Sequence, residues 1–435
     1  MAGMSDTVAA NHPPHSQADR TARLDARLYV LALFILLLGA FALYWTSSFS
    51  LERRFATTFF GADSWHFTEL AAGHFNDRIM RLHPVTVVLA LGWMKLLSPL
   101  TAWIAPIAIL KAMFALIGAL GVVAATHTFA AFMPRRHALL WGAIYAASTG
   151  IWYFSSIEES KILSATLVAC YIAAYLHLRA NLTTGGALAL TGILFIACLN
   201  EITAVFLVAI PAVDVLIRQK KFDWRALRWI VLHALAAVLA LLVLEAIKRF
   251  GVTVAPTPEG TSFFEIFLYY FARNSYDLQS VLAFLARWFF FNIAAPEAEL
   301  HYANSVTRYG GDFEPTLQHY FGSPASAILL TCFAVMAAAT ILLRNHDKAR
   351  APLLGIMLGL AAYALARPSF FFLFLPGECL LYSPSVSLAH LLLLAVPFAA
   401  SRLPYKEVLT GAAAICLLVT NGYFIFTAQA LSYVN

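Results

Sequence analysis

The chain has 435 residues, of which 61% are hydrophobic and only 12% are charged. Soluble domains carry about twice that charged fraction, and the apolar runs here are long enough to cross a bilayer, which takes about 20 residues per helix. The net charge of +6 does not indicate a nucleic-acid partner, because the basic residues lie mostly in short loops beside apolar runs, where they set topology. The composition therefore predicts an all-α, polytopic transmembrane protein.

The first 24 residues differ from the rest of the chain. Residues 1–24 are small, polar and proline-bearing, and they lack the apolar core of a cleavable signal peptide, so we expect a disordered cytoplasmic tail. Residues 25–435 are predicted to form a single transmembrane domain. The five cysteines are scattered without CxxC spacing, which favours small buried side chains over a disulfide or metal set.

The basic loops predict the topology. Three arginines precede the first span, which places the N-terminus in the cytoplasm. Residues 84–106 are apolar but are interrupted by Lys95 and two prolines, so we expect an interfacial helix there. Counting this segment as a span would place the basic loops PRRH and RQKK outside. About eleven spans remain, near residues 28–45, 107–132, 138–153, 162–177, 186–199, 202–217, 230–246, 325–343, 353–365, 385–399 and 408–426.

Two long connections, residues 49–104 and 249–322, then lie on the same extracytoplasmic face. Long loops inside a compact fold are usually functional. The second connection contains the aromatic-rich stretches SFFEIFLYYFAR and LARWFFFNI, which suit helices that lie on the membrane surface. We therefore expect both outer loops to carry amphipathic interfacial helices.

The densest polar segment follows the first span, at residues 61–84, GADSWHFTELAAGHFNDRIMRLHP. Such a cluster at a membrane surface is typical of a functional site. Asp63 is the candidate catalytic residue, either as a general base or as a ligand of a divalent cation. The alternative is a carboxylate that only caps the helix expected from Ser64. His66 and His74 are candidate ligands, although no HxxxH or HExxH spacing is present.

A second acidic point, formed by Glu158 and Glu159 with Lys161, ends the third predicted span. Adjacent carboxylates suit metal binding, with Asp63 and Glu159 as candidate ligands, or the orientation of a hydroxyl acceptor. The alternative is a solvated loop with a local Glu–Lys pair, which contributes little. We expect Asp63 and at least one of the two glutamates to face one cavity at the outer surface.

Several basic residues are candidates to bind an anionic headgroup. Arg81 suits phosphate geometry, as does Arg308 in the second long loop, although both suit ordinary phospholipid equally. His83 precedes a proline that fits the first turn of a helix. Lys111, one turn into the second span, either snorkels or meets a diphosphate. The candidate substrate-binding residues are Glu158, Glu159, Lys161, His83, Arg81, Lys111 and Arg308.

This pattern resembles the GT-C superfamily of integral membrane glycosyltransferases, in particular the protein mannosyltransferase and aminoarabinose transferase branch. That branch has an acid early in its first outer loop, an HPP-type helix, a basic residue opening the second span and a second outer acid. The matching positions are Asp63, His83-Pro84, Lys111 and Glu158 or Glu159. The segment GILFIACLNEITAVFLVAIPAVDVL also resembles the hairpin of spans five and six. The resemblance covers residues 28–220, with Val85 in place of the second proline.

The resemblance implies an enzyme that moves a sugar from a polyprenyl-phosphate donor to a hydroxyl on a lipid, glycan or protein acceptor. Asp63 would accept the hydroxyl proton or position the acceptor, while basic residues, with or without a divalent cation, would stabilise the departing lipid phosphate. The site would face the extracytoplasmic side of a bacterial inner membrane and contact membrane lipids. The alternatives are a lipid or solute transporter or flippase, which would carry intramembrane charges and repeated broken helices, and a non-catalytic assembly factor.

Overall fold

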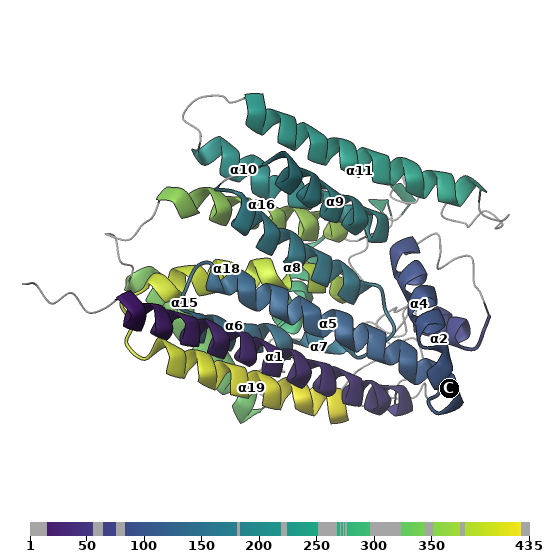
Figure 1. Ribbon diagram of the computed structural model, residues 1–435, viewed down its shortest axis with the longest axis horizontal. Coiled ribbons are helices and arrows are strands. Elements are labelled where there is room, and N and C mark those ends of the chain that lie inside the picture. Colours follow the sequence, from purple (N-terminus) through teal and green to yellow (C-terminus); the bar gives the residue numbers. More distant parts are fainter. Residues whose placement is uncertain are drawn as a thin grey trace, which may run out of the picture.

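The computed structural model describes residues 15–54, 64–74, 83–180, 183–218, 224–250, 268–269, 271–272, 274, 276–295, 323–343, 351–374 and 379–427. Every regular element in these ranges is a helix, and no strand occurs among them. The long helices lie side by side in one bundle (Figure 1). The predicted all-α class is confirmed for this part of the chain.

Seven helices in the described ranges are long and apolar enough to cross a bilayer. An α-helix rises about 1.5 Å per residue, and the hydrocarbon core is about 30 Å thick. These helices are α1 (His15–Arg54), α5 (Pro106–Ala130), α8 (Lys161–Leu178), α11 (Trp224–Phe250), α15 (Pro324–Leu342), α16 (Ala351–Phe374) and α19 (Lys406–Thr427). Their lengths and composition indicate a membrane protein. Helix α1 begins at His15, inside the segment 1–24 that the sequence predicts as a tail.

Four shorter apolar helical segments accompany them: Pro84–Leu96, Thr184–Asn200, Leu278–Phe291 and Pro384–Ala400. The first is α4, whose 13 residues give about 20 Å of helix, less than the hydrocarbon core. The interfacial position expected for residues 84–106 stays a prediction. The second and fourth are α9 and α18, which occupy the positions of two predicted spans and have 17 residues each.

Two of the predicted spans are not single α-helices. The third is divided into α6 (Arg135–Ala147) and α7 (Thr149–Ser155), because the backbone of Ser148 between them is extended, with φ −64° and ψ 141°. The sixth begins as the 3-10 helix η3 (Ile202–Val208) and continues as α10 (Ala209–Arg218). Interruptions of this kind leave backbone groups without helical partners, which other segments must satisfy.

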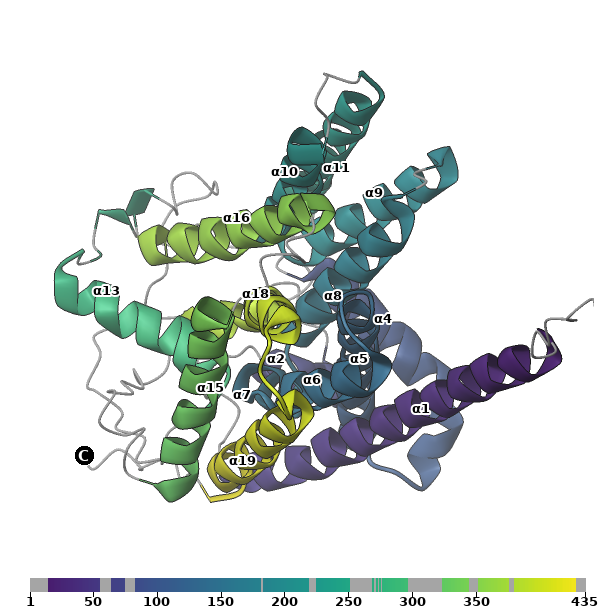
Figure 2. The same ribbon diagram turned by 90° about the vertical axis from the view of Figure 1, so that its left-hand side faces the viewer.

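Part of the second long loop packs into the bundle. Helix α13 (Leu278–Leu285) continues into a π-helical turn, η4 (Ala286–Phe291). Trp288 and Phe291 of this turn are fully buried. Figure 2 shows α13 beside the end of α16, where Phe284 packs edge-on against Phe372 with ring centroids 5.2 Å apart. The sequence predicts this segment to lie on the membrane surface, and within it Phe284, Trp288 and Phe291 belong to the hydrophobic core.

The residues that follow η4 are hydrogen-bonded to the break after α6, and two buried asparagines, Asn292 and Asn421, take part. The freed amides of Thr149 and Gly150 donate to the carbonyl oxygens of Ile293 and Asn292, at 3.1 and 2.9 Å. Asn421 of α19 then donates from Nδ2 to the carbonyl of Ile293 at 2.9 Å. Every buried backbone donor in a membrane bundle needs such a partner. The break in one helix and the docking of a distant loop therefore stabilise each other.

The close packing at Gly150 gives a stability prediction. A Cβ there would lie 2.0 Å from Asn292 Oδ1, so Gly150→Ala must displace the asparagine. We expect this variant to lose about 1–3 kcal/mol of unfolding free energy, as overpacked sites do, and to show a lower thermal midpoint in detergent. The control is Gly192→Ala on α9, where a Cβ meets nothing within 4 Å and alanine favours the helix. Equal midpoints for the two variants would contradict this packing.

Candidate functional site

Six charged side chains within the described ranges are buried around the end of the bundle where α8 begins. They are Lys111, Glu158, Glu159, Lys161, Glu201 and Arg367, and none is more than 8% exposed. A buried charge is costly unless it is paired or binds a ligand. In a membrane protein such a cluster marks a candidate functional site. We call these six residues the buried charge cluster.

Lys111 of α5 and Glu158, from the connection between α7 and α8, form one ion pair of the cluster. Lys111 Nζ lies 3.3 Å from Glu158 Oε1 and donates to the carbonyl oxygen of Ser48, also at 3.3 Å. The ring of Phe49 lies 5.5 Å from the same ammonium group. The structure thus joins two predicted site residues, at a point where the end of α1 and the start of α5 meet.

Glu159 has a different environment from its neighbour Glu158. Its Oε1 accepts hydrogen bonds from the backbone amide and the hydroxyl of Ser160, at 2.8 and 2.9 Å. No group of three or more His, Cys, Asp or Glu side chains within the described ranges is arranged to hold a metal ion. Asp63, the other expected ligand, lies outside those ranges, so the metal site of Asp63 and Glu159 stays a prediction.

Lys161, the first residue of α8, is the cation in the cluster that makes no ion pair within the described ranges, although it lies close enough to Glu201 to lower the pKa of that carboxyl. It is 3% exposed, and within the described ranges its Nζ has neither a hydrogen bond nor an ion pair. Its contact is the face of the Tyr382 ring, whose centroid lies 4.2 Å from Nζ. A cation–π contact stabilises the charge without occupying the ammonium N–H donors. Lys161 is therefore the group best suited to bind an anion.

Glu201 and Arg367 form a second buried pair, between the end of α9 and α16. Arg367 Nη2 is paired with Glu201 Oε1, which also accepts a hydrogen bond from Thr203 Oγ1 at 2.8 Å. Burial raises the pKa of Glu201, but the charges of Arg367 and Lys161, with local hydrogen bonds, outweigh burial and lower it below the usual range. The carboxylate is therefore ionised. Arg367 Nη2 also donates to the carbonyl of Tyr382 at 3.4 Å.

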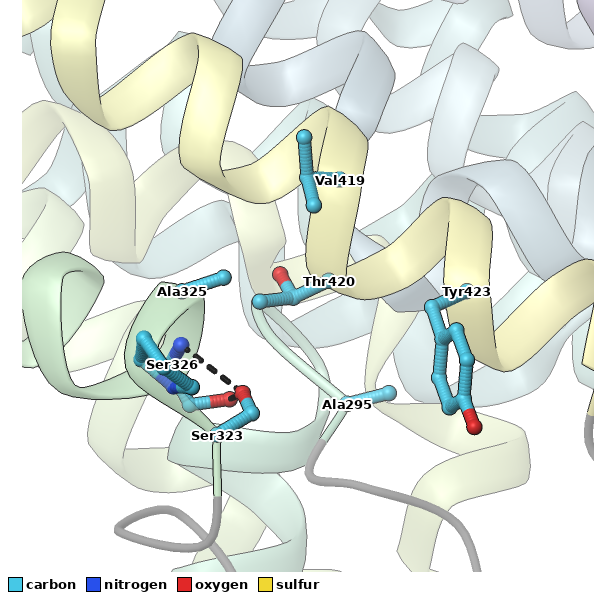
Figure 3. Close-up of a pocket in the computed structure, with 8 residues that line it drawn as sticks. Ala295, Ser323, Ala325, Ser326, Val419, Thr420 and Tyr423 are labelled. Carbon is cyan, nitrogen blue, oxygen red and sulfur yellow. Dashed lines mark hydrogen bonds between the residues drawn. The ribbon is translucent and has the colours of Figure 1, made fainter.

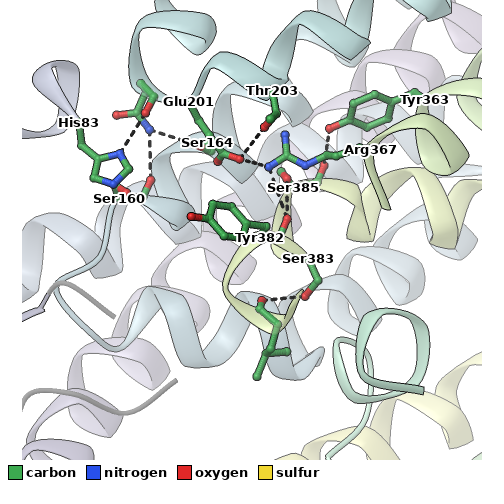
Figure 4. A network of polar contacts seen from close by, with 12 residues as sticks. His83, Ser160, Ser164, Glu201, Thr203, Tyr363, Arg367, Tyr382, Ser383 and Ser385 are labelled. Carbon is green, nitrogen blue, oxygen red and sulfur yellow. Dashed lines mark hydrogen bonds and ion pairs between the residues drawn. The ribbon is translucent and has the colours of Figure 1, made fainter. Parts of the chain in front are cut away.

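His83, immediately before α4, completes the polar network shown in Figure 4. Its Nδ1 lies 3.1 Å from the carbonyl oxygen of Asn200. Burial, together with the nearby charge of Lys161, lowers the pKa of His83 to about 3. The neutral ring must donate from Nδ1, because a carbonyl oxygen only accepts, so Nε2 is the acceptor nitrogen. Asn200 in turn donates from Nδ2 to Ser164 Oγ at 2.9 Å, which links α9 to α8.

The structure thus brings together most of the predicted site residues that it describes. His66 is buried close enough to His83 to influence its pKa, whereas His74 is exposed. Arg367 had no role predicted from the sequence, because it precedes an aromatic run that looked like an outer turn. The signal that could have found it is an arginine inside an otherwise apolar helix. Three predicted site residues lie outside the described ranges: Asp63, Arg81 and Arg308.

The opposite end of α8 carries a buried acid that is fully paired. Asp214 of α10 accepts a hydrogen bond from Tyr175 at 2.6 Å. Its carboxylate oxygens also lie 3.3 Å from Arg179 Nη2 and 3.1 Å from Arg218 Nε. With three partners, Asp214 acts as a structural anchor. The contrast supports the buried charge cluster, and not this second group, as the candidate site.

A cavity of about 300 Å³ lies between α15 and α19 (Figure 3). It is lined by Ala295, Ser323, Pro324, Ala325, Ser326, Val419, Thr420 and Tyr423. None of these side chains is an acid, a base or a histidine. Ser323 and Ser326 are engaged in capping α15, where Ser323 Oγ accepts from the amide of Ser326 at 3.1 Å. The cavity therefore lacks charged side chains of the kind that form the buried charge cluster.

Comparison with known proteins gives no family for this chain. No protein-family model matches it, and no curated protein sequence is significantly similar to it. The functional argument therefore depends on the burial, charge and geometry of its own residues.

The Glu201–Arg367 pair predicts that removing a buried carboxylate destabilises the protein far more than removing an exposed one. Glu201→Gln leaves Arg367 buried without its counter-charge, which typically costs about 3–5 kcal/mol. We expect a large drop in the thermal unfolding midpoint, and substantial recovery in the double variant Glu201→Gln/Arg367→Met, which removes the stranded charge. Glu407→Gln changes an exposed carboxylate and should stay within about 0.5 kcal/mol of wild type. A double variant as unstable as Glu201→Gln would contradict the pairing argument.

Proposed function

We propose that the protein is a membrane glycosyltransferase that moves a sugar from a polyprenyl-phosphate donor to a hydroxyl of a lipid, glycan or protein. The observation that carries this proposal is the buried ammonium group of Lys161, which has no carboxylate within ion-pair distance in the described ranges. An anion is the ligand that such a group favours. A phosphate attached to a membrane lipid would reach a site at the end of a transmembrane bundle directly from the bilayer.

The proposed reaction is a single displacement. The acceptor oxygen forms a bond to the anomeric carbon, the bond from that carbon to the phosphate oxygen breaks, and the hydroxyl proton passes to a carboxylate. Asp63 is the proposed base, and Lys161 stabilises the negative charge on the departing lipid phosphate. Because a lipid phosphate is a good leaving group, positioning and charge neutralisation supply most of the catalysis.

The other predicted residues have supporting roles in this proposal. Arg81 and Arg308 bind the same phosphate or the lipid headgroups around it, and His83 contacts the substrate from the network beside Lys161. Carboxylate oxygens of Asp63 and Glu159 suit a hard divalent cation, which would supply additional positive charge near the leaving phosphate. No step of the proposed reaction depends on that cation.

We also propose that the chain crosses a bacterial inner membrane about eleven times, with the buried charge cluster on the extracytoplasmic side. The basic residues at the start of α6, after α8 and after α10 support this orientation, because cytoplasmic loops carry the excess of lysine and arginine. The two long loops, 49–104 and 249–322, would then border the cluster. A cysteine placed at Arg135 should react with an impermeant thiol reagent only from the cytoplasmic side. Labelling from the outer side would reverse the topology.

A lipid or solute transporter is the second candidate. The broken helices, α6–α7 and η3–α10, lie in a bundle that also buries charges, and discontinuous helices near charged groups are common in transporters. A transporter would bind the same anionic lipid without breaking the bond between sugar and phosphate. Assays of both transfer and lipid movement therefore distinguish the two functions.

The role of Asp63 gives the central prediction about chemistry. Asp63→Asn keeps the size and the capping ability of the residue but removes the negative charge, and asparagine caps a helix about as well as aspartate. General base catalysis is worth a factor of about 10² to 10⁴. We therefore expect normal membrane expression and at least a hundredfold loss of sugar transfer. The assay uses purified protein, a panel of polyprenyl-phosphate sugars, and detection of free lipid phosphate.

The matched control is Asp25→Asn on the exposed face of α1, which should retain full activity. Full activity in Asp63→Asn would exclude the proposed role of that residue. If the wild type turns over no lipid-linked donor but moves lipid across the membrane of a vesicle, the protein is a transporter and not a glycosyltransferase.

A further inference from the structure

Tyr382 contacts two cations of the buried charge cluster at once. It is the last residue of the short helix α17 (Cys379–Tyr382), between α16 and α18. Its ring faces the ammonium group of Lys161 at 4.2 Å, and its carbonyl oxygen accepts from Arg367 Nη2 at 3.4 Å. Figure 4 shows Tyr382 between the His83 side of the network and Arg367. A single residue therefore connects Lys161 of α8 to the Glu201–Arg367 pair.

Two other aromatic side chains hold the Tyr382 ring in position. Phe371 of α16 stacks against it with ring centroids 4.0 Å apart and an angle of 16° between the planes. Phe371 stacks in turn on Trp288 of the docked outer segment, at 5.8 Å and 28°. Both supporting rings are buried, with exposures of 2% or less. This stack prevents the tyrosine ring from turning away from Lys161.

An aromatic face suits a cation that must bind an anionic ligand. A carboxylate partner would neutralise the ammonium group and occupy its N–H donors, so an incoming phosphate would have to displace it. The negative face of the aromatic ring attracts the ammonium charge and leaves its N–H groups available as hydrogen-bond donors. Lys161 is thereby held in position, and its N–H donors are left for another group. The cost of burying the ammonium is offset in part by the ring and by the nearby charge of Glu201, and a bound anion would offset it further.

We propose that Tyr382 is the positioning residue that presents Lys161 to the phosphate of a polyprenyl lipid. This inference rests on the proposed function, and it assigns Tyr382 to the binding of the donor and not to the chemical step. The face of the ring is what matters, so Tyr382→Phe preserves the contact and Tyr382→Leu removes it. The hydroxyl group of Tyr382 has no part in the inference.

The test measures binding of a synthetic long-chain polyprenyl monophosphate to the purified full-length protein. A buried cation–π contact of the usual strength corresponds to a roughly 5- to 30-fold change in affinity. We expect Tyr382→Leu to weaken binding by that factor and Tyr382→Phe to bind within about twofold of wild type. Phe284→Leu is the packing control, because Phe284 stacks on Trp288 in the same aromatic cluster but contacts neither Lys161 nor Arg367. It should bind within about twofold of wild type.

A double-mutant cycle shows whether Tyr382 acts through Lys161. In a Lys161→Met background, Tyr382→Leu should weaken binding by less than about twofold, because the contact is already absent. If Tyr382→Leu does not fold, a fluorinated phenylalanine at position 382 replaces it, since fluorination weakens the ring quadrupole at nearly constant shape. Binding should then fall as fluorine atoms are added.

The outcomes separate the inference from the proposed function. Wild-type affinity in Tyr382→Leu, or an equal loss in Tyr382→Phe and Tyr382→Leu, overturns the role of Tyr382. In either case a loss of binding in Lys161→Met still supports the lipid-phosphate site. If Lys161→Met binds the lipid as wild type does, or if the wild type does not bind it, both proposals fail.

Discussion

The cost of burying charge in a membrane bundle is the constraint on which this structure depends. Arg367 has Glu201, and Lys111 has Glu158, so each cation is neutralised by a carboxylate from another element. Lys161 has an aromatic ring where the other two cations have an acid. This buried, ring-supported ammonium group is the physical reason for proposing an anionic ligand.

The interrupted helices connect that group to a distant part of the chain. The break after α6 frees the amides of Thr149 and Gly150, and the segment around Asn292 satisfies them. The same docked segment contributes Trp288, which supports Phe371 and through it the Tyr382 ring. The second long loop is therefore part of the scaffold of the site. Substitutions in this loop, although far from Lys161 in sequence, should alter the position of Lys161 through the aromatic stack.

Most of the helices and several of the site residues could be predicted from the sequence, because hydrophobic runs mark the long helices of a membrane protein. Apolar runs identified the seven described helices that are long enough to cross a membrane, and Lys111, Glu158 and Lys161 were conspicuous as charges within or beside such runs. The break at Ser148 was missed, because nothing local marks it and its hydrogen-bond partners are far along the chain. Arg367 was missed because its counter-charge, Glu201, is brought to it only by tertiary packing. Local patterns reveal which residues are unusual, whereas pairing depends on the fold.

The most direct test of the account is an experimental structure of the protein with a long-chain polyprenyl monophosphate. The account predicts phosphate density within about 4 Å of Lys161 Nζ, the distance of an ion pair, with the isoprenoid chain leading from the buried charge cluster to the bilayer. A phosphate bound elsewhere, or Lys161 paired with a carboxylate such as Asp63 while the lipid is bound, would contradict it.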